Sequence, residues 1–146
     1  IIAYLGCDMI YPLKKEIPSH FYGNGQADTL RSDITLQSLE AKSVRLMALA
    51  QIHNCSVVNL SKLPKSRLLF PRTSITKLLK KIDQKKVLYS QDLKLDSKSI
   101  KRALDLEGEL AYMVPSGKYW ESSVKFDRSK LSEIDSLWLK SASKLN

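Results

Sequence analysis

The sequence predicts an α/β fold, namely a partial Rossmann-like, mainly parallel sheet flanked by helices, with a helical C-terminal part. Three segments predict it: an apolar run over residues 1–6, a helical pattern over about 33–52, and the β-branched run SVVNL over 56–60. Strand, helix and strand in this order are typical of a parallel βαβ unit. The 146 residues, 43% of them hydrophobic, suffice for one domain with its own core.

The first run, IIAYL, is apolar and β-prone, and Gly6 bounds it, so we expect a buried strand. Because the chain opens inside such a run, we also expect sequence upstream of it. A long loop follows, from Cys7 to about Ser32. It cannot be regular, because it contains several breakers: Pro12, Pro18, Gly23 and Gly25.

A helix is expected to open at Asp33, which is a good N-cap residue, and to end at Ile52. His53 and Asn54 supply the stop, since Asn tolerates the left-handed conformation. The predicted buried face consists of residues at helical spacing: Leu36, Leu39, Leu46, Met47 and Ala50.

Three further helices are predicted, over about 74–83, over 98–113 with Ser97 as its cap, and over 129–143. In the helix over 98–113 we expect the apolar residues to face the core, namely Ile100, Ala103, Leu104, Leu110 and Ala111. The third has the stripe Leu131, Ile134, Leu137 and Trp138, and we expect Trp138 to pack rather than to stack on a ligand. We divide the chain into an α/β part, 1–72, and a helical extension of the same domain, 73–146.

Charge favours anionic partners. The formal net charge is +9, and the densest basic group is Lys77, Lys80, Lys81, Lys85 and Lys86. That group is either a solvated helix face or an anion-binding segment, and it lacks interleaved aromatic residues for single-strand nucleic-acid binding. Cys7 and Cys55 have no CxxC partner, so we expect reduced cysteines in a cytosolic protein and no zinc site.

Ligands of open α/β sheets bind beyond the carboxyl ends of the strands, which is where the loop after residue 6 begins. His20, in PSHFYG, is the sharpest catalytic candidate, because an imidazole titrates near neutral pH and suits a general base. The alternative is a loop histidine that hydrogen-bonds to backbone. Tyr4 and Tyr11 are candidate donors to a phosphate, although Tyr4 also suits a packing role.

Asp8 follows the first strand directly and either orients the loop or acceptor or serves a turn. Tyr22 lies on the same loop. Arg67 and Arg72 flank LLFP and are either phosphate partners or surface charge. Phosphate-loop, DxD and GxSxG motifs are absent from the sequence, and three acidic residues at two-residue spacing do not converge on one helix face: Asp105, Glu107 and Glu109.

The ordered segments YLGCDMIYP, PSHFYG, SLEAKSVRL and VVNLSKLPKSRL resemble the C-terminal half of bacterial family 42 sialyltransferases. The resemblance covers about residues 3–72. It implies a metal-independent, inverting transfer of a sugar from a CMP-activated donor. His20 matches the family's general base, Tyr4 and Tyr11 match the tyrosines that bind the departing phosphate, and Asp8 matches an acidic residue of that stretch. Ser66 lies in the segment near the nucleotide.

The sequence also departs from that family. Its Gly-Asn-Gly-x-Ser nucleotide-binding stretch is absent here, so we expect much of the donor site to lie outside this chain. The second half, with ALDLEGELAYMVPSGKYWESS, matches no segment of those enzymes. The donor is therefore expected to carry sialic acid or another acidic sugar of the Kdo type.

We therefore expect a glycosyltransferase, incomplete in this stretch, that acts on surface polysaccharide or lipopolysaccharide. Its expected partners are the CMP-sugar donor and a glycan acceptor, with no cofactor, no metal and no nucleic acid. We expect a cytoplasmic location, with peripheral association with the inner membrane. The alternative is a basic binding module for nucleic acid or anionic surfaces, which the charge favours.

Overall fold

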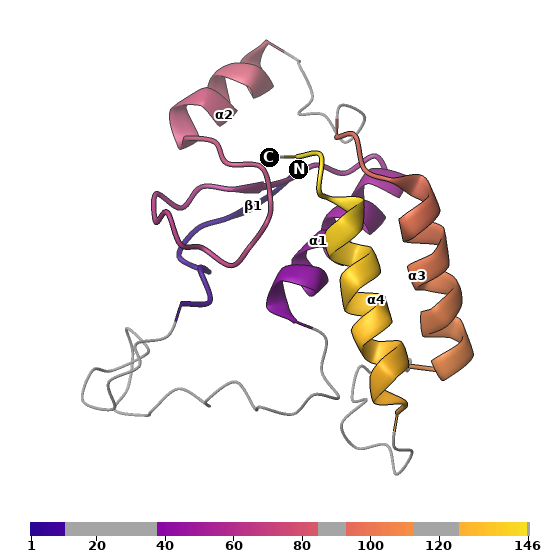
Figure 1. Cartoon of the computed structure of the whole chain (residues 1–146). Helices are drawn as coiled ribbons and strands as arrows, with labels where there is room; N and C mark the ends of the chain where they lie inside the picture. Colours follow the sequence, from indigo (N-terminus) through magenta and orange to yellow (C-terminus); the bar gives the residue numbers. More distant parts are fainter. Residues whose placement is uncertain (11–37, 85–92, 113–125, 146) are drawn as a thin grey trace, which may run out of the picture.

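The computed structural model describes residues 1–10, 38–84, 93–112 and 126–145 (Figure 1). Within these ranges the chain forms two short strands, β1 (Ile2–Tyr4) and β2 (Val57–Asn59), and four helices. The helices are α1 (Leu39–Ile52), α2 (Ile75–Asp83), α3 (Ser97–Leu110) and α4 (Arg128–Ser141). The predictions that concern Tyr11, His20 and Tyr22 lie outside the described residues.

The prediction of a Rossmann-like sheet flanked by helices is wrong. In the described ranges the sheet has two strands, and most of the regular structure is helical. The first strand is not buried either, since Ile1, Ile2 and Leu5 are exposed. The core lies instead among α1, α3 and α4, and Figure 1 shows α3 and α4 side by side next to α1. An apolar β-prone run predicts a strand, but its burial depends on which elements pack against it.

The strands β1 and β2, which precede and follow α1 in the sequence, pair directly in parallel, with Tyr4 opposite Asn59. Backbone hydrogen bonds extend the pairing: Ile2 N donates to Ser56 O at 2.8 Å, and Leu60 N donates to Tyr4 O at 2.8 Å. The carboxyl ends of both strands therefore lie next to each other. This edge is where the polar residues described below gather.

Helix α1 begins after Ser38, whose side chain accepts a hydrogen bond from Ala41 N at 3.1 Å. The predicted cap Asp33 lies outside the described residues. The helix ends at Ile52 as predicted, and Asn54 adopts a φ of 52°. Its buried face is made mainly of small residues rather than leucines, so the prediction that Leu46 is buried is wrong. The buried residues are Ala41, Ser43, Val44, Met47, Ala48 and Ala50.

Helix α3 is capped by Asp96, not Ser97, and ends before Ala111, which adopts a left-handed φ of 48°. The prediction that Ala111 faces inward is therefore wrong, because it is exposed at the end of the helix. Helix α4 is capped by Asp127. Its predicted stripe is confirmed, because Leu131, Ile134 and Trp138 are buried.

One buried carboxylate links the three core helices. Glu107 on α3 is only 5% exposed, and Arg45 Nε on α1 donates to its two oxygens at 3.0 and 2.9 Å. Trp138 Nε1 on α4 donates to Oε1 at 2.9 Å. The sequence did not single out Glu107, because its role depends on an arginine and a tryptophan from distant segments. A buried charge held by such partners fixes how the helices face one another.

The helices in the described ranges are all too short or too polar to cross a membrane. The cysteines Cys7 and Cys55 are free. Both are partly buried.

Replacing Glu107 with Gln should lower the free energy of unfolding by about 2–4 kcal/mol, because it leaves the Arg45 guanidinium without its charged partner. Urea unfolding measures this. Glu109→Gln on the same helix is the matched control. Glu109 is exposed and its ion pairs with Arg102 and Lys130 are 3.7 and 3.4 Å long, so its loss should cost less than about 1 kcal/mol. Equal effects of the two substitutions would contradict the structural role of Glu107.

Candidate functional site

Polar side chains gather beyond the carboxyl ends of β1 and β2. We call Asp8, Glu40, Asn59, Ser66 and Arg67 the strand-end cluster. They come from the segment after β1, the first turn of α1, the last residue of β2 and the segment that follows it. In parallel sheets this edge is the usual place for a ligand, since side chains and loops from several segments converge there.

Asn59 organises the segment that follows β2. Its side-chain oxygen accepts from Ser61 N at 2.9 Å, and its amide nitrogen donates to Ser66 Oγ at 3.0 Å. Its backbone N donates to Pro71 O at 2.9 Å, and its backbone O accepts from Thr73 N at 3.1 Å. The chain thus leaves the strand, loops around the Asn59 side chain and returns alongside it. Asn59 is fully buried, and this turn fixes the position of Ser66.

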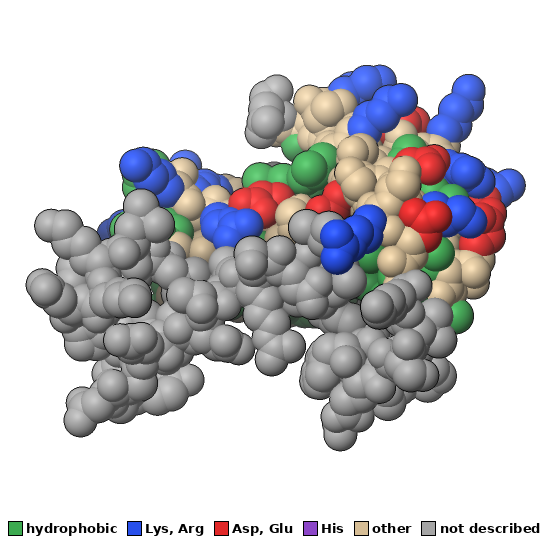
Figure 2. All heavy atoms as spheres, turned by 60° about the horizontal axis from the view of Figure 1, so that its bottom comes forward, with side chains coloured by type: hydrophobic (Ala, Val, Ile, Leu, Met, Phe, Trp, Pro, Cys, Tyr) green, Lys and Arg blue, Asp and Glu red, His purple; other side chains and the backbone are tan. Residues whose placement is uncertain are grey.

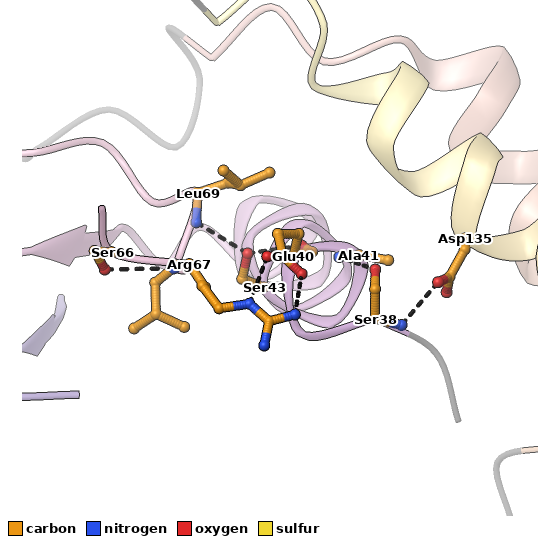
Figure 3. A network of polar contacts seen from close by, with 9 residues as sticks. Ser38, Glu40, Ala41, Ser43, Ser66, Arg67, Leu69 and Asp135 are labelled. Atoms are coloured by element: carbon orange, nitrogen blue, oxygen red, sulfur yellow. Dashed lines mark hydrogen bonds and ion pairs between the residues drawn. The ribbon is translucent and has the colours of Figure 1, made fainter. Parts of the chain in front are cut away.

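Arg67 connects the two strand ends with α1 (Figure 3). Its backbone N donates to Asp8 O at 3.0 Å. Its guanidinium forms a two-point ion pair with Glu40, with Nε to Oε1 at 2.6 Å and Nη2 to Oε2 at 2.9 Å. Arg67, which the sequence put forward as a phosphate partner, is therefore already engaged by a carboxylate that the sequence did not single out.

The same segment is tied to α1 at a second point. Ser43 Oγ donates to Glu40 O at 2.7 Å and accepts from Leu69 N at 3.0 Å (Figure 3). At the start of α1, Ser38 N donates to Asp135 Oδ2 on α4 at 2.7 Å. Helix α1 is thus fixed both to the strand-end cluster and to the helical core.

Two carboxylates near α1 have shifted pKa values of opposite sign. The hydrogen bond from Arg67 holds the pKa of Glu40 below its usual value, against the opposing effect of partial burial. Burial raises the pKa of Asp135, and the hydrogen bond from Ser38 only partly offsets it. Asp135 Oδ1 is buried without a hydrogen-bond partner, which agrees with that direction.

Asp8 is the least satisfied member of the strand-end cluster. The residue is 8% exposed, and its Oδ1 is buried without a hydrogen-bond donor. A buried carboxylate oxygen without a donor is unfavourable, so a ligand hydroxyl or amide that supplies one is stabilised there. Of the described site candidates, Asp8 therefore has the clearest unused capacity to bind a ligand.

The remaining described candidates lie around this cluster. The Tyr4 ring packs on Phe70 with the ring centroids 5.1 Å apart, which suits the packing alternative. Arg72 is exposed and donates to the backbone oxygens of Leu63 and Pro64 at 2.6 and 3.2 Å. It forms an isolated bridge with Asn59 and so helps to close the turn around that side chain.

A cavity of about 610 Å³ adjoins the cluster. Ser66 and Arg72 contribute polar groups to it, and the C-terminal end of α4 closes its far side. Its lining is otherwise largely apolar: Pro64, Leu68, Leu69, Phe70, Pro71, Leu93, Leu139, Ala142, Ser143 and Leu145. Ser66 therefore faces both the strand-end cluster and a space large enough for a small ligand.

No group of three or more His, Cys, Asp or Glu side chains with metal-binding geometry occurs among the described residues. Sequence reasoning missed Glu40 and Asn59. A signal for Asn59 was present, because Asn is depleted in strands and this one ends a β-branched run. No local signal marked Glu40, whose partner lies in a distant segment.

Comparisons of this chain with protein-family models, curated proteins and solved structures found no match.

The Glu40–Arg67 pair should stabilise the fold in a pH-dependent way. Because the folded-state pKa of Glu40 is lowered, its contribution is present above the unfolded pKa near 4.5 and is lost as the pH falls through the folded value. With both partners partly exposed, we expect about 0.5–1 kcal/mol. Urea unfolding of the native protein and Glu40→Gln from pH 7 to pH 3 measures it. A difference that stays constant over that range would contradict the pair.

The Asp135 carboxyl should change the stability of the fold with pH in the opposite direction. Since its folded-state pKa is raised, stability is highest with the carboxyl protonated and falls as the pH rises through the folded value. The native protein should therefore lose stability relative to Asp135→Asn between pH 4 and pH 7. Unfolding curves of both proteins over this range test the sign, and a relative gain for the native protein would refute it.

Proposed function

We propose that this chain is part of a glycosyltransferase that moves an acidic sugar, sialic acid or a Kdo-like sugar, from a CMP-activated donor to a cell-surface glycan. The transfer is inverting and needs no metal. The resemblance to bacterial family 42 sialyltransferases motivates the chemistry. The geometry of the strand-end cluster is the structural support for it.

One observation carries the proposal. The resemblance names Asp8 and Ser66 from two segments far apart in the sequence, and both belong to one cluster in the fold. The backbone hydrogen bond from Arg67 N to Asp8 O, at 3.0 Å, joins these segments directly. The proposal does not require a larger sheet, since the cluster is built from β1, α1, β2 and the segment after β2.

In the proposed reaction, the acceptor hydroxyl gives its proton to the His20 imidazole and its oxygen attacks the anomeric carbon of the donor. The bond from that carbon to the phosphate oxygen breaks, and its electron pair leaves with CMP. Asp8 is suited to hold a hydroxyl of the acceptor, because its buried Oδ1 needs a donor. Ser66, beside the cavity, is suited to donate a hydrogen bond to the nucleotide.

The chain has two histidines, which provide a matched pair of variants. In the complete enzyme, His20→Ala should lower turnover by roughly 10²–10⁴, the usual effect of losing a general base. His53→Ala should leave turnover unchanged, because His53 is exposed at the end of α1 and caps that helix through its backbone. The measurement is steady-state transfer from a CMP-activated sugar. Near-normal turnover of His20→Ala would refute the assignment of the base.

Nucleotide binding tests the proposal independently of turnover. CMP should raise the thermal unfolding temperature of the complete enzyme, because a ligand that binds only the folded state stabilises it. Ser66→Ala should reduce that shift, while Ser136→Ala, on the exposed side of α4, should not. A native protein whose unfolding temperature does not respond to CMP would contradict a CMP-activated donor.

A further inference from the structure

Helix α2 has an apolar face that the described residues leave uncovered. Ile75, Leu79 and Ile82 are 60%, 54% and 46% exposed. Their spacing of four and three residues puts them on one side of the helix. Three large aliphatic side chains on one exposed face are more than the scattered apolar residues of an ordinary protein surface.

The helix is held to the protein along one edge. Leu78 is its buried residue, and it packs with Val58 and Leu60. Figure 1 shows α2 standing apart from α1, α3 and α4. The apolar face is thus presented by a helix whose position β2 fixes.

The opposite side of α2 is basic. Lys77 and Lys80 are exposed, Lys81 lies on the same side, and Asp83 is the one acidic residue of the helix. On α3 and α4, in contrast, acidic and basic side chains pair, as in the ion pairs of Arg102 with Glu109 and Glu133. Figure 2 shows acidic and basic side chains interspersed on the side of the molecule where Figure 1 places α3 and α4. Helix α2 is therefore both amphipathic and locally cationic.

We propose that α2 binds an anionic lipid bilayer by lying in the membrane surface. Its aliphatic face enters the boundary between headgroups and acyl chains, and Lys77 and Lys80 lie at the level of the lipid phosphates. An apolar face combined with a lysine-rich polar face is typical of interfacial helices. The lysines reach the headgroups with their charged ends while their methylene stems lie along the helix.

A nucleic acid fits this helix less well than a lipid surface. A phosphate backbone would engage the lysines but leave Ile75, Leu79 and Ile82 exposed to water. Helix α2 has no aromatic side chain on which bases could stack. A bilayer, in contrast, uses both faces at once, which is why the lipid surface is the partner that we infer.

The test is sedimentation of the full chain with vesicles. The protein should bind vesicles of phosphatidylcholine mixed with phosphatidylglycerol, and should bind vesicles of pure phosphatidylcholine only weakly. Lys77→Gln together with Lys80→Gln should weaken binding roughly 30-fold, since each lysine near an anionic surface contributes about a factor of five. Leu79→Gln should weaken it roughly 5-fold through lost apolar burial.

Matched controls lie on other helices. Lys98→Gln together with Lys101→Gln on α3 makes the same change of charge at exposed positions, and Ile52→Gln at the end of α1 removes an aliphatic side chain that is equally exposed. Both controls should change vesicle binding less than about 2-fold. The α3 lysines lie on another helix, and charges more than about 10 Å from a surface are largely screened. Ile52 is not part of the α2 face that enters the bilayer. Thermal unfolding of every variant verifies that the fold is retained.

A second readout locates the contact. With Trp introduced as Leu79→Trp, brominated phosphatidylcholine in the anionic vesicles should quench its fluorescence, whereas Ile52→Trp should stay unquenched. Equal loss of binding in the α2 and control variants would overturn the proposal, as would an unquenched Leu79→Trp. Salt-sensitive binding to RNA or DNA without vesicle binding would also overturn it and assign the lysines to nucleic acid.

Discussion

The ion pair between Arg45 and Glu107 sets how α1 lies against α3, and the hydrogen bond from Trp138 adds α4 to the same carboxylate. A buried charge of this kind tolerates few arrangements, because each alternative leaves an ion without its partners. The orientation of α1 matters beyond the core. The helix presents Glu40 and Ser43 to the segment after β2, and these two residues fix Arg67 and Leu69. The geometry of the strand-end cluster therefore depends on how the helical core is assembled.

The cluster itself combines satisfied and unsatisfied groups. Asn59 and the Glu40–Arg67 pair are held in place by hydrogen bonds between segments. Asp8 is joined to Arg67 through its backbone oxygen and has a buried side-chain oxygen that lacks a donor. Binding sites place positioned groups around such an atom, so that a ligand can supply the missing hydrogen bond without moving its neighbours.

Sequence reasoning succeeded where one segment contains the whole signal. The stripe of α4 and the end of α1 at Asn54 were predicted from local periodicity and turn chemistry. The predicted fold class is wrong, because burial of the first strand depends on the elements that pack against it, and its own residues do not reveal those elements. The buried face of α1 was predicted in part, because Met47 and Ala50 are buried but Leu46 is exposed. Close packing also buries the small residues Ala41, Ser43 and Ala48, which the apolar pattern did not include.

The site was predictable in the same partial way. Asp8, Ser66 and Arg67 were named from the sequence, and they lie together in the structure. Glu40 and Glu107 were not named as functional or structural partners, because an ion pair between distant segments leaves no mark in either one. The net charge could not distinguish basic residues that form ion pairs within the protein from those that face solvent, whereas their exposure in the structure does. Arg67 forms an ion pair within the cluster, whereas Lys77 and Lys80 of α2 are exposed on a helix that also carries an apolar face.

The central claim is that the strand-end cluster binds the nucleotide of an activated sugar. A titration of the isotope-labelled complete enzyme with CMP, followed by amide chemical shifts, tests it most directly. The account predicts saturable shifts concentrated at Asn59, Ser66 and Arg67, with the amides of α3 unchanged. No saturable shift at these three residues, or shifts confined to α2 as for a nonspecific anion, would contradict it.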